Sequence, residues 1–258
     1  MQRREIIRLF AASAASLWGR QQLSAGALMA AATPGGAAGK ASISGVLVPQ
    51  ENALPEPLLP LFPLQLVLFP RASLPLHIFE ERYKEMIQDC LENQWEFGVL
   101  LVQGPSLENI GCTASISEVV HRYPDGRMDI LVRGQRRFEI SLLNQEKSYL
   151  RGKPQFLEDD KTEPPAKELQ RQAIELNNRL MELLGLKEPS LKKPSPAESN
   201  GQVSFQIMAD LPAGLSWKQS LLELQSERER LVRVVGYLQR LIAYLERVRD
   251  QRAPAGTV

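Results

Sequence analysis

The sequence contains few residue patterns that could support catalysis. The stretch Thr33–Ala41 (TPGGAAGKA) approaches a phosphate-binding loop, but Pro34 stands where that motif needs glycine and Ala41 where it needs serine or threonine. The two histidines, His77 and His121, are far apart in sequence, and His-based triads and metal sites need more partners than these. A Ser–Lys dyad has no local motif, so this alternative stays open. We predict no catalytic residue, no metal and no cofactor.

Seven basic residues are candidates for a nucleic-acid surface. Nearby acids such as Glu80, Glu81, Glu118 and Glu139 could neutralise them. The formal net charge of +1 and the lack of aromatic residues between the basic ones favour ion-paired strand faces over RNA binding. RNA is therefore the alternative partner, and it is not the favoured one. The seven residues are Arg122, Arg127, Arg133, Arg136, Arg137, Arg151 and Lys153.

The composition is typical of a globular protein. The chain has 258 residues, of which 43% are hydrophobic and 24% charged, enough for one or two packed domains. No apolar run reaches the roughly 18 residues of a transmembrane helix. Cys90 and Cys112 form no C-x-x-C pair, so we interpret them as free thiols of the core in a reducing compartment.

Residues 1–54 differ from the rest and are excluded from the predicted fold. Arg3–Arg8 (RREIIR) resembles a twin-arginine export motif, but Arg20 interrupts the apolar stretch that export requires. An acid-poor segment rich in arginine, serine and alanine also suits an organelle transit peptide, and Met29 offers a later start. We expect a disordered leader or a targeting segment. A cytoplasmic location is favoured over export or organelle targeting through the first 40 or so residues.

Residues 55–160 are predicted to form a small β-barrel with one packed helix. Prolines punctuate the apolar stretch LPLFPLQLVLFP, and proline belongs at strand starts, edges and bends. The pattern predicts strands at 59–62, 66–69, 97–102 and 149–157, and a helix over 80–93. Two further strands, at 114–123 and 127–140, flank the turn Pro124-Asp125-Gly126.

Residues 161–258 are predicted to form a helical bundle, so the fold class is α+β. Apolar residues at helical spacing predict long helices over 164–184 and 227–251, with shorter ones at 203–211 and 216–225. Gly185 is the stop signal of the first helix. Residues 187–201 are rich in proline and serine and are predicted to be a flexible connector.

Several segments together resemble the amino-terminal substrate-binding domain of the Lon ATP-dependent proteases. The resemblance covers about residues 58–250 and implies a PUA-like pseudo-barrel joined to helices. The segments occur in the family's order: LPLFPLQLVLFP at 59–70, RASLPLHIFEERYKEMIQDCL at 71–91, FGVLLV at 97–102, GCTA at 111–114, PDGRMDILVRGQRRFEI at 124–140 and KQSLLE at 218–223.

The resemblance implies recognition of unfolded or damaged polypeptide rather than hydrolysis. Lon proteases continue with an ATPase and a Ser–Lys peptidase module, neither of which has a counterpart in this sequence. We therefore predict a non-catalytic adaptor in protein quality control, whose partners are polypeptide clients or a protease or chaperone. The candidate peptide contacts, for which packing in the core is the alternative, are Leu66, Phe69, Leu74, Ile78, Tyr83, Phe205, Trp217 and Leu221.

One structural contact is also predicted from the matched segments. Glu80 opens the first helix, and Arg137 lies in the strand GQRRF. We predict that the two form an ion pair across the barrel, where losing one partner would leave a buried charge.

Overall fold

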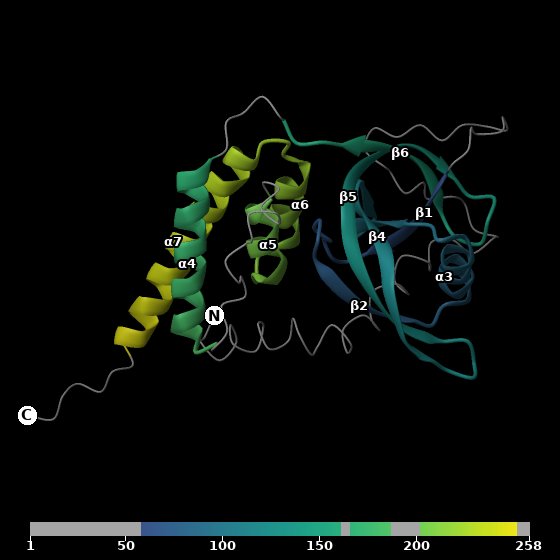
Figure 1. The fold of residues 1–258 in the computed structure, drawn as a ribbon, viewed down its shortest axis with the longest axis horizontal. Coiled ribbons are helices and arrows are strands. Elements are labelled where there is room, and N and C mark those ends of the chain that lie inside the picture. Colours follow the sequence, from purple (N-terminus) through teal and green to yellow (C-terminus); the bar gives the residue numbers. More distant parts are fainter. Residues whose placement is uncertain (1–57, 161–165, 187–201, 252–258) are drawn as a thin grey trace, which may run out of the picture. The chain divides into compact units, whose positions relative to one another are not determined.

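The computed structural model describes residues 58–160, 166–186 and 202–251 (Figure 1). The predicted leader at 1–54 and the predicted connector at 187–201 lie outside these residues. The described chain divides into two compact units. We call residues 58–158 with 214–223 the barrel unit, and residues 159–213 with 224–251 the helical unit. The mixture of one sheet and several helices confirms the α+β prediction.

The barrel unit is built on a six-stranded sheet that closes on itself. Its strands are β1 (Leu59–Leu64), β2 (Ser73–Ile78), β3 (Phe97–Gln103), β4 (Ser106–Arg122), β5 (Met128–Asn144) and β6 (Arg151–Leu157). The order is β2-β5-β4-β3-β1-β6, and β6 also pairs with β5, which closes the ring. Only β1 and β3 are parallel. The long β4 and β5 reach beyond the ring and carry β2 at their far end (Figure 1).

The second predicted strand was misplaced. Residues 66–69 are not a strand, and the strand that follows β1 is β2, which contains Pro75. Phe69 to Ala72 form a tight turn in which Ala72 N–H donates to the carbonyl of Phe69, with Arg71 in the left-handed region at φ 66°. Proline thus sits at a turn and in an edge strand, where its missing N–H costs least.

The core of the barrel unit has two parts. Helix α3 (Glu81–Asn93) covers one side of the sheet through Tyr83, Met86, Ile87 and Cys90, as the helical spacing predicted. A second cluster surrounds the fully buried Phe138 inside the ring. A Cβ atom on Gly98 would lie 2.4 Å from the ring of Phe138, so glycine there makes room for that ring.

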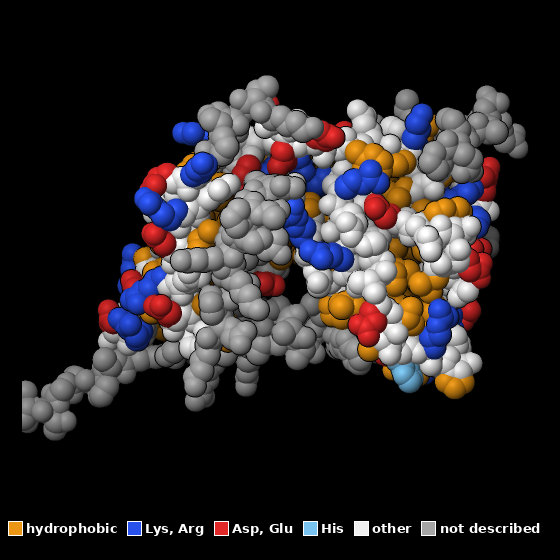
Figure 2. Space-filling model, in the orientation of Figure 1, with side chains coloured by type: hydrophobic (Ala, Val, Ile, Leu, Met, Phe, Trp, Pro, Cys, Tyr) orange, Lys and Arg blue, Asp and Glu red, His pale blue; other side chains and the backbone are white. Residues whose placement is uncertain are grey.

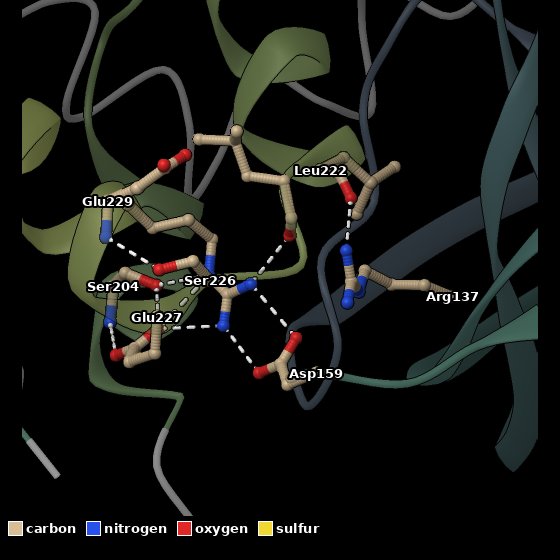
Figure 3. Close-up of polar contacts among 9 residues, drawn as sticks. Arg137, Asp159, Ser204, Leu222, Ser226, Glu227 and Glu229 are labelled. Atoms are coloured by element: carbon tan, nitrogen blue, oxygen red, sulfur yellow. Dashed lines mark hydrogen bonds and ion pairs between the residues drawn. The ribbon is translucent and has the colours of Figure 1, made fainter. Parts of the chain in front are cut away.

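Helix α6 (Leu215–Glu223) belongs to the barrel unit, although its place in the sequence predicts it as part of the helical bundle. Two side chains join it to the sheet. Arg137 donates to the carbonyl of Leu222 at 2.8 Å (Figure 3), and Gln219 donates to the carbonyl of Ile110 at 3.0 Å. The sequence could not show that α6 belongs to the barrel unit, because in chain order α6 comes between α5 and α7, which both belong to the helical unit.

The helical unit contains α4 (Lys167–Leu184), α5 (Val203–Asp210) and α7 (Glu227–Asp250). Helices α4 and α7 lie side by side and run in the same direction (Figure 1). Gly185 ends α4 in a left-handed conformation, and the Ser226 hydroxyl caps α7 by accepting from Glu229 N–H. Most of the apolar stripe predicted for α7 is buried, including Leu231, Leu238 and Leu245, whereas Leu241 and Val248 are half-buried.

Candidate peptide-binding site

The far end of strands β2, β5 and β4 brings together residues that are distant in the sequence. In the sheet register, Asp129 of β5 lies between His77 of β2 and His121 of β4. The chain then turns through Pro124-Asp125-Gly126, where Gly126 adopts a φ of 83°, as the hairpin prediction requires. This places Tyr123 beside both histidines.

Asp129 anchors this end of the sheet. Its side chain is only 4% exposed and accepts hydrogen bonds from His77 Nδ1 at 2.5 Å and from the Tyr123 hydroxyl at 2.8 Å. Burial by itself would raise the pKa of Asp129, but the hydrogen bonds from His77 and Tyr123 outweigh burial and lower it. Both carboxylate oxygens are therefore committed to holding two aromatic rings in place.

Four rings follow one another around that anchor. His77 stacks on Phe79 with ring centres 6.0 Å apart and meets the edge of Tyr123 at 5.9 Å. Tyr123 in turn contacts His121 at 4.4 Å, and the Arg127 guanidinium lies 4.9 Å from the centre of the Tyr123 ring. These contacts make the rings a fixed platform rather than independent side chains.

The platform carries exposed apolar surface. Phe79 is 38% exposed and Val120 is 53% exposed, and His121 is also exposed. Phe79, Val120, His121 and Tyr123 together are called the hairpin surface below. Figure 2 shows a histidine beside hydrophobic side chains at the lower right, where the β4–β5 hairpin of Figure 1 ends.

The strand edges near this surface are poorly suited to pairing with an added strand. Among the described strands, β3 pairs with β4 only as far as Ala114. Beyond that point β4 has two irregularities, since Ser117 and Val120 have no partner in the β5 register. Bulges on β4 and Pro75 in β2 both blunt open sheet edges. Val120 itself has no partner in the register and is exposed, so its side chain is accessible at this point.

Replacing Asp129 with asparagine should lower the stability of the barrel unit by about 2 kcal/mol near neutral pH, because the amide NH2 replaces one carboxylate oxygen and would face a donor instead of accepting from it. The pKa of Asp129 is lowered on folding, so its contribution is present above its ordinary value of 3.8 and is lost as pH falls through the folded-state value. Urea unfolding across this acid range should show the two proteins converging. The exposed variant Glu118→Gln should match the wild type throughout, and an Asp129→Asn protein of unchanged stability would refute the anchor role.

Most of the predicted peptide contacts are core residues. Six of the eight are buried: Phe69, Leu74, Ile78, Tyr83, Phe205 and Leu221. Their large apolar side chains fill the interior, which was the alternative for each of them. Leu66 and Trp217 are half-buried and keep some accessible surface.

In place of the predicted ion pair with each other, the structure gives Glu80 and Arg137 different partners. Glu80 pairs with Arg82, two residues along the chain, and Arg137 donates to Leu222. Glu80 follows β2, whose last residue Ile78 lies opposite Met128 at the start of β5. Arg137 is nine residues further along β5, a separation of roughly 30 Å in an extended strand.

Four of the seven basic residues are buried or have local partners. Arg137 is buried, Arg127 pairs with Asp125, and Arg151 pairs with Glu146. Arg136 stacks on Phe156 at 3.8 Å and lies 3.5 Å from Glu96. These local contacts support the ion-paired interpretation over a nucleic-acid surface. Within the described ranges, no group of three or more His, Cys, Asp or Glu residues could hold a metal ion.

The hairpin surface was missed by sequence reasoning for one reason. His77 and His121 were set aside because they are distant in the chain, and the strand that carries His77 was not predicted. Once a strand at 73–78 is recognised, its pairing with the strand after the PDG turn brings both histidines to Asp129. The available signal was the position of polar and aromatic residues on both sides of the PDG turn: His121 and Tyr123 come before it and Asp129 comes after it.

Residues 58–240 match the family described as the ATP-dependent protease La (LON) substrate-binding domain. The chain belongs to this family. Lon relatives include the Lon protease of Parabacteroides distasonis, 27% identical over 194 residues, and that of Escherichia coli K12, 24% identical over 199 residues. The two matches cover 70% and 73% of this chain, but 24% and 25% of the proteases. The chain thus spans about a quarter of the length of these curated Lon relatives.

Solved Lon domains have the same fold. A Lon N-terminal domain protein from Xanthomonas campestris, 26% identical, gives a TM-score of 0.56 and covers 70% of this chain and 99% of its own. The N-terminal domain of the Mycobacterium avium complex Lon protease, 16% identical, gives 0.52 and covers 71% and 98%. The Lon-family barrel with its helices is thereby confirmed. Among the described residues, no helix is both long and apolar enough to cross a membrane.

Proposed function

We propose that this Lon-family chain is a non-catalytic module that binds apolar segments of unfolded polypeptide through the hairpin surface. Two exposed residues carry the proposal: Phe79, which stacks on the His77 ring held by the buried Asp129, and Val120, which precedes His121 in β4. The family description as a substrate-binding domain supports polypeptide as the ligand. We further propose a role as an adaptor in protein quality control, with a protease or chaperone as partner.

The chemistry of the hairpin surface favours apolar and aromatic client side chains. Burying a phenylalanine or valine against a client contributes about 1.5–3 kcal/mol each, and fixed rings lose little conformational freedom on binding. Edge-to-face contact with a client ring adds to this. Folded proteins rarely expose such segments, so the surface distinguishes unfolded clients from folded ones.

The double variant Phe79→Ser/Val120→Ser tests this proposal. We expect it to bind reduced, carboxymethylated α-lactalbumin at least tenfold more weakly than the wild type, about 1.4 kcal/mol, as measured by fluorescence anisotropy. Native α-lactalbumin should bind neither protein. Binding should change little with salt, because apolar contacts are not screened.

A matched control separates the hairpin surface from general stickiness. Trp95 is 47% exposed on the same unit but lies in the loop after α3, so Trp95→Ser should leave the affinity unchanged. Equal loss in the control and the double variant would contradict the assignment of the site. A Kd that weakens steeply with added salt would point instead to an ionic ligand such as RNA.

A further inference from the structure

The exposed face of α7 carries a straight row of arginines. Arg233, Arg240 and Arg247 are seven residues apart and exposed, and we call them the arginine row. Residues at this spacing lie on one side of a helix, about 10.5 Å apart along its axis. Among the described residues, none of the three arginine side chains has a hydrogen bond or ion pair; the Arg247 carbonyl accepts from Gln251 N–H at the end of the helix. The three and four positions on either side of Arg240 hold no acid that could pair with it.

Helix α4 carries an acidic row with the same spacing. Glu168, Glu175 and Glu182 are also seven residues apart and exposed, and we call them the glutamate row. Among the described residues, the Glu168 and Glu182 carboxylates pair with exposed arginines of their own helix, Arg171 and Arg179. Both rows span 14 residues, about 21 Å of helix. The glutamate row lies opposite the buried side of α4, as the arginine row does on α7.

Two small residues lie on the same side of α7 as the arginine row, between successive arginines. Gly236 and Ala243 complete the spacing 233-236-240-243-247, the three-four alternation by which one helix packs along another. Glycine weakens the middle of a helix relative to alanine. A Cβ atom on Gly236 would meet only the end of Arg240, at 3.5 Å, so the described residues do not require glycine there. A second helix could approach closely along this line.

We propose that the arginine row receives the glutamate row of a second copy of this chain. The opposite charges and the equal spacing of the two rows select this occupant. The formal net charge of +1 also gives little general repulsion between copies. Since α4 and α7 pack on each other and each row lies opposite the buried side of its helix, one copy can offer the two rows to two different neighbours. Such head-to-tail contacts build closed rings or longer assemblies rather than a two-fold dimer.

Sedimentation analysis of the full chain tests this self-association. At low salt, about 50 mM, the average mass should rise with protein concentration, and at about 500 mM salt the protein should return to monomer. Two row variants should each stay monomeric at low salt: Glu168→Lys/Glu175→Lys/Glu182→Lys and Arg233→Glu/Arg240→Glu/Arg247→Glu. An equimolar mixture of the two should assemble again, because each then offers the charge that the other lacks.

Two controls separate the interface from folding and from net charge. Arg228→Glu reverses an exposed charge on another side of α7 and should leave assembly intact. Gly236→Gln places a helix-forming side chain where a Cβ atom is in ordinary contact with the end of Arg240, so it should raise helix stability while it blocks the approach of the second copy. A wild-type protein that is monomeric at every concentration and salt, or assembly that persists in both row variants, overturns the proposal. Failure here leaves the hairpin surface and client binding untouched.

Discussion

Replacing Arg230 with methionine should lower the stability of the helical unit by about 3–5 kcal/mol, the range for breaking a buried ion pair from one side. Arg230 is fully buried on α7, and its guanidinium binds both carboxylate oxygens of Asp159. It also pairs with Glu227 and donates to the carbonyl of Leu224 (Figure 3). The variant would remove the cation that binds both Asp159 and Glu227.

The same arginine organises the start of two helices. Its Nε donates to the Ser204 hydroxyl at 3.1 Å, its guanidinium lies 4.3 Å from the centre of the Phe205 ring, and Glu227 accepts from Ser204 N–H. The N-termini of α5 and α7 are thus held to one side chain. The two helix N-termini should therefore lose their order together when Arg230 is replaced. The destabilisation should extend through the helical unit rather than remain local.

The pH dependence of the Arg230→Met variant follows from Glu227. Burial already raises the pKa of Glu227, and Arg230 opposes that rise. Without Arg230 the pKa rises further. A raised pKa favours folding at low pH and loses that contribution as pH increases. The difference in free energy of unfolding between the wild type and the variant should therefore shrink as pH is lowered from about 7 to about 5.

Hydrogen exchange resolved by unit is the appropriate measurement, because a chain with two units need not unfold in one step. Protection should fall in α5 and α7 and persist in the barrel unit. The exposed Arg233→Met on the same helix should have little effect. Adding Glu227→Gln to Arg230→Met should recover part of the loss, and a purely additive double variant would argue against the shared network.

Gly134→Ala should destabilise the barrel unit by about 3 kcal/mol, near the upper end of the overpacking range. A Cβ atom at this position would lie 2.2 Å from the carbonyl oxygen of Phe69. That backbone cannot move aside easily, because Gly134 N–H donates to Ala72 and the Gly134 carbonyl accepts from Arg71. The added methyl would separate β5 from the turn that leads into β2.

Gly214→Ala is the matched control. It lies in the same unit, and a Cβ atom there would have no neighbour within 4 Å. Urea unfolding followed through the barrel unit should show a large shift of the midpoint for Gly134→Ala and almost none for Gly214→Ala. Equal midpoints for the two variants would mean that the Phe69–Ala72 turn can move to accommodate the methyl group. The close approach of Gly134 to Phe69 would then not require glycine.

The sequence predicted the fold wherever a single local signal decided the structure. The apolar spacing of α3 and α7, the glycine that ends α4 and the PDG hairpin all follow from residues close in the chain. The sequence did not predict the strand at 73–78, because residues 66–69 and 73–78 are both apolar candidates, with prolines in or beside them, for the strand after β1. Only the pairing of 73–78 with β5 decides between the two segments. Local patterns contain no information about that pairing.

The candidate site was less predictable than the fold. Apolar residues of the proline-rich stretch looked like contacts, yet Phe69, Leu74 and Ile78 are needed to fill the core. The hairpin surface depends on register, which brings His77, Asp129 and His121 side by side from three strands. Arg137 shows the same limit, since its partner is a backbone carbonyl 85 residues further along the chain.

The place of α6 in the chain has a consequence for biosynthesis. The described chain passes from the barrel unit to the helical unit after residue 158, returns for Gly214–Glu223 and leaves again. A nascent chain therefore completes its last strand long before the ribosome releases the helix that accepts the Arg137 hydrogen bond. During that interval the barrel lacks one of its own elements. We expect chaperones that act at the tunnel exit to engage this stage, and a truncation after residue 160 to remain permanently in it.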